Sequence, residues 1–388
     1  MKAMTGERIV FDADAHIMEG SNWLSDFADE EVKKSLFTMP VEKLGGKLAE
    51  WVKLAESGAH PPENIPELEK NILGGPKGYE ALGAFNSEER SRTLDIIGID
   101  AQLVFSTFAS LQFAGIRDPD ILYRGAAAHN RAMGNWCSND KRLLGVASIP
   151  LRYPDRAAKA AKEAVEMGCS AIGVAPHPAG DLSPGHPDLD PFWRVLEETE
   201  TPFMLHIGPY HIKPAYMNNG RPRPVDFIGS GEGVMAKDFP NVHHKVEEFL
   251  TTICFDGVFE RFPGLRGGVI EHGADWVPSF IRRLDYTHRM WAKSTPELKE
   301  MKRKPSEQFS EQMRFTPGIW ENVSQLISES NDRLYCFSTD YPHVEGGRDP
   351  FGKFEATLQD CSAETRTRFY SGNFADMMRS KIPQSAAT

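Results

Sequence analysis

Acidic and imidazole side chains stand at the ends of four apolar runs, where they can do chemistry together. The first run, RIVFDADAH, closes with Asp14 and His16, which are two positions apart and therefore share one face of an extended chain. His206 lies in PFMLHIG, His272 in LRGGVIEHG and Asp340 in LYCFSTDYPH. Two carboxylates and three imidazoles gathered in one place are a set of potential metal ligands.

A divalent cation is the simplest compensation for such a cluster. Burying two carboxylates beside several imidazoles is costly unless protons or a metal ion offset the charge. Two aspartates balance the charge of the ion, and neutral imidazoles complete a mixed nitrogen and oxygen shell that suits Zn, Mn or Fe. Water bound to such an ion loses a proton near neutral pH. We therefore predict one divalent-metal centre, with a second ion as an open alternative.

Eight strand-like runs position these residues, at 8–16, 99–107, 143–151, 169–176, 202–208, 265–273, 313–317 and 334–343. Stretches with helical patterning alternate with them, at 87–97, 119–139, 154–167, 191–199, 242–261, 277–291 and 318–328. Repeated βα units imply a parallel sheet, and eight of them imply closure. The sequence thus predicts an α/β fold, a (β/α)8 TIM barrel whose catalytic groups lie at the carboxyl ends of the strands.

One domain, residues 1–388, accounts for the length, because α/β barrels reach this size with insertions. Residues 37–85 interrupt the alternation of strands and helices with segments rich in Pro, Gly and Lys, such as HPPENIPELEK and LGGPKGYEALG. A long insertion after the first strand tends to be functional. We expect residues 37–85 to be a lid or an interface segment over the barrel mouth.

In these motifs the sequence resembles the amidohydrolase-related branch of the amidohydrolase superfamily, which includes aminocarboxymuconate semialdehyde decarboxylase and the resorcylate and carboxyvanillate decarboxylases. The motifs are DADAH, MLHIG, IEHGADWVPSFIRRLD and STDYPH, and ERSRTLDIIGID, FERFPGLRGGVIEHG and SGNFADMM extend the likeness over nearly the whole chain. The resemblance implies that Asp14, His16, His206 and Asp340 hold the metal and that Asp340 is also the general acid/base. It implies that His272 orients water or polarises a substrate oxygen, although a third imidazole ligand remains open.

The activity implied by this resemblance is that of a metal-dependent enzyme for a small aromatic or unsaturated carboxylic acid. Non-oxidative decarboxylation fits, with Asp340 delivering a proton, and so does hydrolysis of an acyl or C–C bond by a metal-bound water. One scaffold hosts both chemistries, so the fold does not choose between hydrolase and carboxy-lyase. A non-catalytic partner subunit is a further alternative, against which the retained ligands argue.

A different reaction class is also open, because relatives with a DxHxxE start and a DYPH end include dinuclear iron or manganese–iron monooxygenases. This chain has both motifs, with Glu19 in the first and His343 in the second. Together with Glu271 and Asp12, these residues offer donors for a second metal or for support of the first. Asp12 reads equally well as a structural hydrogen-bonding residue.

Four arginines lie where they can meet a substrate carboxylate, since a guanidinium binds a carboxylate through two parallel hydrogen bonds. They are Arg90, Arg92, Arg221 and Arg223. Solvation at the surface is the ordinary alternative for each.

Composition narrows the partners to small molecules and copies of the same chain. The formal net charge is −11, and the basic stretch MKRKP is too short and isolated for nucleic acid. No apolar run is long enough to span a membrane, and the N-terminal residues do not read as a signal peptide. Five scattered cysteines without a CxxC pair suit a reducing compartment. We expect a cytoplasmic homo-oligomer, a dimer or larger, with no nucleic-acid or membrane partner.

Overall fold

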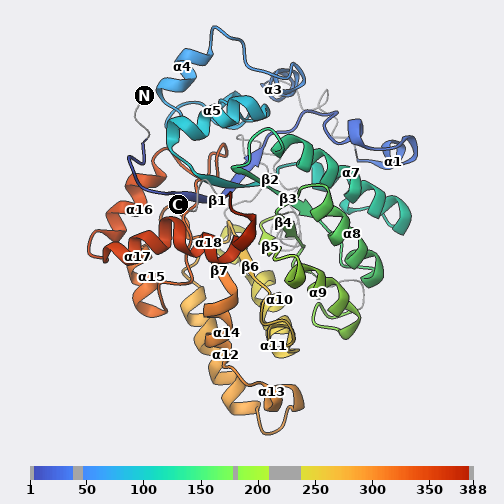
Figure 1. Cartoon of the computed structure of the whole chain (residues 1–388), viewed down its shortest axis with the longest axis vertical. Coiled ribbons are helices and arrows are strands. Elements are labelled where there is room, and N and C mark those ends of the chain that lie inside the picture. Colours follow the sequence, from blue (N-terminus) through green and yellow to red (C-terminus); the bar gives the residue numbers. More distant parts are fainter. Residues whose placement is uncertain (1–3, 38–46, 178–181, 209–236, 384–388) are drawn as a thin grey trace.

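The sheet is a set of parallel strands in which each strand pairs with the next along the chain (Figure 1). The computed structural model describes residues 4–37, 47–177, 182–208 and 237–383. Within them the strands are β1 (Phe11–Ile17), β2 (Ala101–Ser106), β3 (Leu143–Ser148), β4 (Ala171–Gly173), β5 (Phe203–His206), β6 (Gly267–Ile270) and β7 (Met313–Phe315). Seven of the eight expected runs are thus strands in the described part of the chain, in the expected order.

The eighth expected run closes the barrel without forming a regular strand. Cys336 N–H donates to Phe315 O of β7 at 2.9 Å, and Ala13 N–H of β1 donates to Phe337 O at 3.0 Å. Further along, Asp340 N–H donates to Asp14 O at 2.9 Å. The segment therefore bridges β7 and β1, and the predicted α/β barrel is confirmed.

Helices surround the strands in Figure 1. Their bounds are α1 (Glu30–Ser35), α3 (Lys47–Glu56), α4 (Ile65–Lys70), α5 (Ser87–Ile97), α6 (Ala109–Ala114), α7 (Pro119–Cys137), α8 (Pro154–Glu166), α9 (Asp190–Glu198), α10 (His244–Phe255), α11 (Val258–Arg261), α12 (Val277–Trp291), α13 (Pro296–Glu300), α14 (Pro305–Gln312), α15 (Val323–Glu329), α16 (Pro350–Leu358), α17 (Ala363–Thr367) and α18 (Asn373–Met378). The helix expected over 242–261 is two helices, because Gly257 adopts φ 76° between α10 and α11. The helix expected over 318–328 begins only at Val323, where the Asn322 side chain caps it.

The end of the barrel opposite the polar rim is filled by apolar side chains and covered by helix α18. Phe11, Leu103 and Met204 belong to a buried cluster that also contains Phe374 and Met377 of α18. The rings of Phe11 and Phe374 lie 5.4 Å apart. Because this end is closed, the polar strand ends at the opposite rim are where a ligand can enter.

The described part of the predicted insertion packs against the polar rim. Tyr79 O–H donates to Glu19 O at 2.9 Å, and Gly78 N–H donates to Pro342 O at 2.8 Å. His60 is tied to Glu89 of α5, with Nδ1 2.6 Å from Oε2. Residues 47–85 are therefore anchored to the segment that follows β1 and to the eighth run. Their role as a lid or an interface segment stays a prediction.

The described residues contain no disulfide, and all five cysteines are thiols. Within these residues every helix is too short or too polar to span a lipid bilayer.

Candidate metal centre

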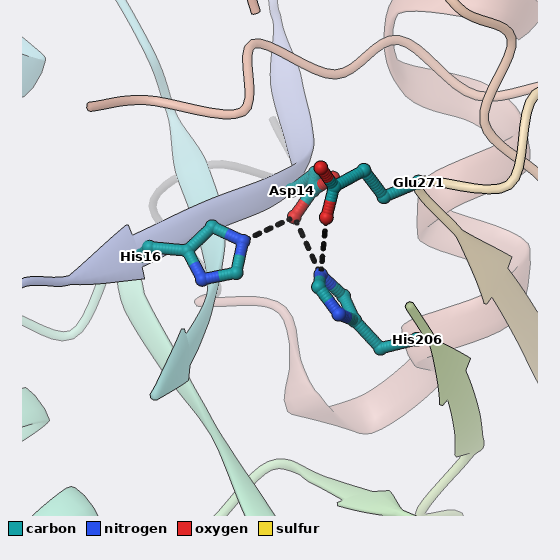
Figure 2. Close-up of side chains that lie close together, drawn as sticks. All are labelled: Asp14, His16, His206 and Glu271. Atoms are coloured by element: carbon teal, nitrogen blue, oxygen red, sulfur yellow. Dashed lines mark ion pairs between the residues drawn. The ribbon is translucent and has the colours of Figure 1, made fainter. Parts of the chain in front are cut away.

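Four side chains from three strand ends meet at the polar rim of the barrel. Asp14 Oδ1 lies 3.4 Å from His16 Nε2 and 3.5 Å from His206 Nε2. His206 Nε2 also lies 3.3 Å from Glu271 Oε2. Figure 2 shows these carboxylate oxygens and imidazole nitrogens pointing toward one another. Asp14, His16 and His206, which come from strands far apart in the sequence, thus lie close together as predicted, and Glu271 joins them.

Local backbone geometry explains why each of these side chains faces the same point. Asp14 and His16 are alternate residues of β1, and His206 is the last residue of β5. Glu271 follows β6 with φ 64°, a left-handed conformation that is rare outside glycine. Its N–H donates to Thr316 Oγ1 at 2.9 Å, which helps hold this turn. The turn after β6 therefore places the Glu271 side chain in the cluster, where the sequence had favoured His272.

A second group of donors adjoins the first and shares His16 with it. Asp340 Oδ1 lies 3.5 Å from His16 Nε2 and 3.1 Å from His343 Nδ1. The His16 and His343 rings are stacked, with centroids 3.9 Å apart. On its other side, His343 Nε2 lies 3.0 Å from Thr107 Oγ1. Asp340 thus lies beside the predicted ligand His16, in a donor group that adjoins the group of Asp14, His16 and His206.

The donor set fits a divalent metal ion. Ligand atoms separated by about 3.4 Å are what metal–ligand bonds of about 2.1 Å at tetrahedral angles produce. Asp14 and His16 are each 1% exposed, so an uncompensated carboxylate there is costly. Asp14 Oδ1, His16 Nε2 and Asp340 Oδ2 form no well-aligned hydrogen bond within the described residues. A cation between Asp14 Oδ1 and His16 Nε2, which lie 3.4 Å apart, satisfies both of these atoms.

The electrostatics of the cluster keep the His16 imidazole in the neutral form that binds metals. Burial, and then the neighbouring His343, hold the pKa of His16 well below its usual value. Burial alone would raise the pKa of Asp14, but His16 and His206 lower it below its usual range. Burial raises the pKa of Asp340 to about 6, against the opposing effect of His343. An ionised Asp14 beside a neutral His16 is a ligand pair ready for a cation.

His272, expected to orient water or polarise the substrate, is placed differently from Glu271. It is buried at 4% exposure but belongs to neither donor group among the described residues. Glu271, which the sequence offered only as a donor for a second metal or for support, contributes to the main group instead. The positive φ of Glu271 is the cause, and no residue type in the motif signals it.

Asp12 and Glu19 are held by hydrogen bonds and lie outside both donor groups. Asp12 accepts from Thr339 N at 2.8 Å, Thr339 Oγ1 at 2.6 Å and Gln102 Nε2 at 2.8 Å. Glu19 accepts the N–H groups of Thr107 and Phe108, each at 3.0 Å. Of the two readings left open for Asp12, this geometry favours structural hydrogen bonding.

Of the four arginines expected to bind a substrate carboxylate, the structure describes two, and neither faces the donor groups. Arg90 is fully buried and donates to His16 O at 2.6 Å, Gly83 O at 2.8 Å and Gln102 Oε1 at 3.0 Å. Arg92 pairs with Glu69 at the surface. Arg221 and Arg223 lie outside the described residues. Arg90 therefore supports the backbone of His16 because all of its donor groups point into the protein.

Two cavities flank the cluster. The larger, of about 400 Å³, is lined by His16 and His206. The smaller, of about 130 Å³, is lined by Asp14, Glu271 and Asp340. Sequence reasoning did not predict how this space is divided, because it depends on the loops between the strands.

Two curated proteins are similar to this chain in sequence. The chain matches gamma-resorcylate decarboxylase from Rhodococcus jostii (strain RHA1) with 26% identity over 213 residues, 52% of this chain and 60% of that protein. It thus spans less than two thirds of that relative. The gamma-resorcylate decarboxylase of Polaromonas sp. (strain JS666) is 23% identical over 318 residues, 77% of this chain and 89% of the relative.

Solved structures share the fold over nearly the whole chain. An amidohydrolase from Mycobacterium avium subsp. paratuberculosis superposes with a TM-score of 0.73 at 18% identity, covering 96% of this chain and 99% of that one. A 5-carboxyvanillate decarboxylase from Novosphingobium aromaticivorans, solved with manganese and a nitrobenzoic acid, superposes with a TM-score of 0.63 at 17% identity, covering 97% and 99%. The family model described as amidohydrolase matches residues 91–378. The chain therefore belongs to the amidohydrolase family, as its motifs predicted.

Proposed function

We propose that this chain is a metal-dependent, non-oxidative decarboxylase of an aromatic carboxylic acid. The observation that carries the proposal is a pair of adjoining donor groups beside two cavities. Asp14, His16, His206 and Glu271 form one group, and Asp340 and His343 join His16 in the other. The names of the two curated relatives support the reaction, and the manganese in one related structure supports the choice of manganese over zinc or iron.

In this proposal Asp14, His16, His206 and Asp340 hold one ion, with Glu271 as a further oxygen ligand. When bound, the ion supplies positive charge that grips the substrate carboxylate and an adjacent hydroxyl oxygen. The cavities on either side of the cluster leave room for the ring.

Asp340 carries the proton for the reaction. The bond between the ring carbon and the carboxylate breaks, carbon dioxide leaves, and the electron pair stays on the ring carbon. A proton from the Asp340 carboxyl group then forms the new C–H bond. Asp340 lines the smaller cavity, so its carboxyl group reaches bound ligands. His343, with Nδ1 3.1 Å from Asp340 Oδ1, is placed to return a proton after each cycle.

The test is carbon dioxide release from 2,6-dihydroxybenzoate and related hydroxybenzoates by the manganese-loaded chain. In deuterium oxide the ring carbon that loses the carboxylate should gain one deuterium. Asp340→Asn should abolish the release, and metal content measured in parallel separates loss of the proton donor from loss of the ion. Water addition to the substrate without carbon dioxide would point to the hydrolytic alternative.

A dinuclear oxygenase is the second candidate, because His16, Asp340 and His343 form a second donor group beside the first. Because both groups use His16 Nε2, which can bind one ion only, a second ion would be held by the remaining donors of its group. Glu19 weakens this reading, since its carboxylate accepts backbone N–H groups and belongs to neither group. Two redox-active ions per chain, together with dioxygen uptake in the presence of substrate, would favour the oxygenase over the decarboxylase.

A further inference from the structure

The larger cavity extends from the metal-centre histidines into an apolar chamber. His16 and His206 line one part of it, and the ring of Phe105 lies 4.3 Å from that of His206. Its apolar wall includes Phe105, Leu111, Phe113, Val146, Val174 and Met204. Cavities of several hundred Å³ take drug-sized ligands. A single carboxylated ring would leave much of this 400 Å³ unfilled.

Three hydrogen-bonded side chains place a polar group of fixed direction in this wall. Asn130 Oδ1 accepts the N–H of Ser148 at 2.9 Å, which identifies that atom as the amide oxygen. His129 Nδ1 lies 3.0 Å from the same oxygen, so Nδ1 carries a proton and donates it. His129 Nε2 lies 2.9 Å from Ser106 Oγ, and both Ser106 and His129 line the cavity.

The direction of the last hydrogen bond follows from the charge of His129. Burial lowers the pKa of His129 to about 4, so the imidazole is neutral at neutral pH. With its proton on Nδ1, Nε2 is an acceptor, and the hydroxyl of Ser106 must donate to it. The capacity that remains on Ser106 Oγ is that of an acceptor. A ligand in the cavity therefore meets an oxygen that accepts an O–H or N–H group.

We propose that this cavity is a specificity subsite for carboxylic acids with an apolar body larger than one ring and a hydroxyl or amino group that donates to Ser106. The substrate class rests on the proposed function, since it assumes that the carboxylate lies at the metal centre. His129 and Asn130 are positioning residues, because they fix the direction of the Ser106 hydroxyl.

Binding of neutral two-ring probes to the full-length, metal-free chain tests the subsite apart from the reaction. The probes are 2-naphthol, which donates a hydrogen bond, and 2-methoxynaphthalene, which does not. The key variants are Ser106→Val and Ser106→Thr, which have the same shape and differ by the hydroxyl. Ser110→Ala is the matched control, since Ser110 lines the same cavity without belonging to the Ser106–His129–Asn130 chain. Melting temperatures check that each variant is folded.

The wild-type chain, Ser106→Thr and Ser110→Ala should bind 2-naphthol roughly tenfold more tightly than its methyl ether, as one hydrogen bond provides. In Ser106→Val the two probes should bind within about twofold of each other. Leu111→Trp, which fills the chamber from a half-buried position, should weaken both probes. No preference in the wild type, a preference that survives in Ser106→Val, or no binding of either probe would each overturn the subsite.

A second measurement ties the subsite to the reaction. The manganese-loaded chain should bind 1-hydroxy-2-naphthoate more tightly than salicylate, its one-ring counterpart, and Leu111→Trp should reverse that order. Equal binding of the two acids would contradict the substrate class. Failure of carbon dioxide release with intact binding of both probes would instead reject the decarboxylase and leave the subsite standing.

Discussion

The carboxylate of Asp12 accepts two hydrogen bonds from Thr339, one from its backbone N–H at 2.8 Å and one from its hydroxyl at 2.6 Å. This contact joins the first strand to a segment more than three hundred residues away, immediately before Asp340. Gln102 of β2 donates to the same carboxylate at 2.8 Å. Asp12 thereby fixes the position of Asp340 relative to Asp14, without belonging to either donor group.

Replacing Asp12 with Asn should destabilise the fold and weaken metal binding together. The amide would turn an NH2 group toward a donor, either Thr339 or Gln102, and leave a buried donor unsatisfied. The expected loss is about 2 kcal/mol in the free energy of unfolding, measured by urea titration. Asp26→Asn, at an exposed position, is the control and should change nothing. Unchanged stability of the Asp12 variant would show that its contacts with Thr339 do not hold the barrel closed.

Removal of a predicted ligand should cost the chain its metal. Asp14→Ala and His206→Ala each delete one donor atom, and manganese affinity should fall at least tenfold, since even loss of supporting contacts costs that much. Equilibrium dialysis with elemental analysis measures it. His244→Ala removes an exposed imidazole and should leave binding unchanged. Equal metal content in all three variants would place the ion elsewhere.

The same manganese-binding assay should distinguish the roles of Glu271 and His272. Glu271 Oε2 lies 3.3 Å from His206 Nε2, whereas His272 belongs to neither described donor group. Glu271→Gln should therefore weaken manganese binding more than His272→Gln does. If the His272 variant loses more metal, the open reading of His272 as a third imidazole ligand is correct.

The stability of the fold should fall on acidification partly through His129. Its pKa is lowered to about 4 in the folded chain, below the ordinary value of 6.5. The unfolded chain therefore takes up this proton first, so stability is lost as pH falls from about 6.5 to about 4, by a few kcal/mol at most. His129→Gln should remove that part of the pH dependence. Unfolding free energies of both proteins at pH 7 and pH 4.5 provide the comparison, and parallel losses would contradict the assignment.

Most of what positions the site was predictable from the sequence. Apolar runs ending in Asp14, His206 and Asp340 predict strands and place their ends at one rim, because parallel strands share a direction. The helix over 87–97 was predicted with its exact bounds, and the Asn86 side chain caps its start by accepting the N–H of Glu89.

The parts that were not predicted depend on backbone conformation or on contacts between distant segments. The left-handed φ of Glu271 turns that carboxylate into the cluster, whereas the sequence motif favoured the neighbouring His272 for the catalytic role. Arg90 suits a carboxylate clamp by residue type, yet its burial directs its donors to His16 O, Gly83 O and Gln102. In the eighth run, Thr339 N–H donates to the Asp12 side chain and Phe337 N–H donates to Phe369 O, so neither continues a regular strand ladder.

A single ion shared by strand ends is the central claim, and anomalous diffraction from manganese-soaked crystals tests it most directly. We predict a manganese peak within bonding distance of Asp14 Oδ1, His16 Nε2, His206 Nε2 and a carboxylate oxygen of Asp340. A map with no peak among these atoms, or with manganese bound only at another place, would contradict the metal centre and the decarboxylase built on it.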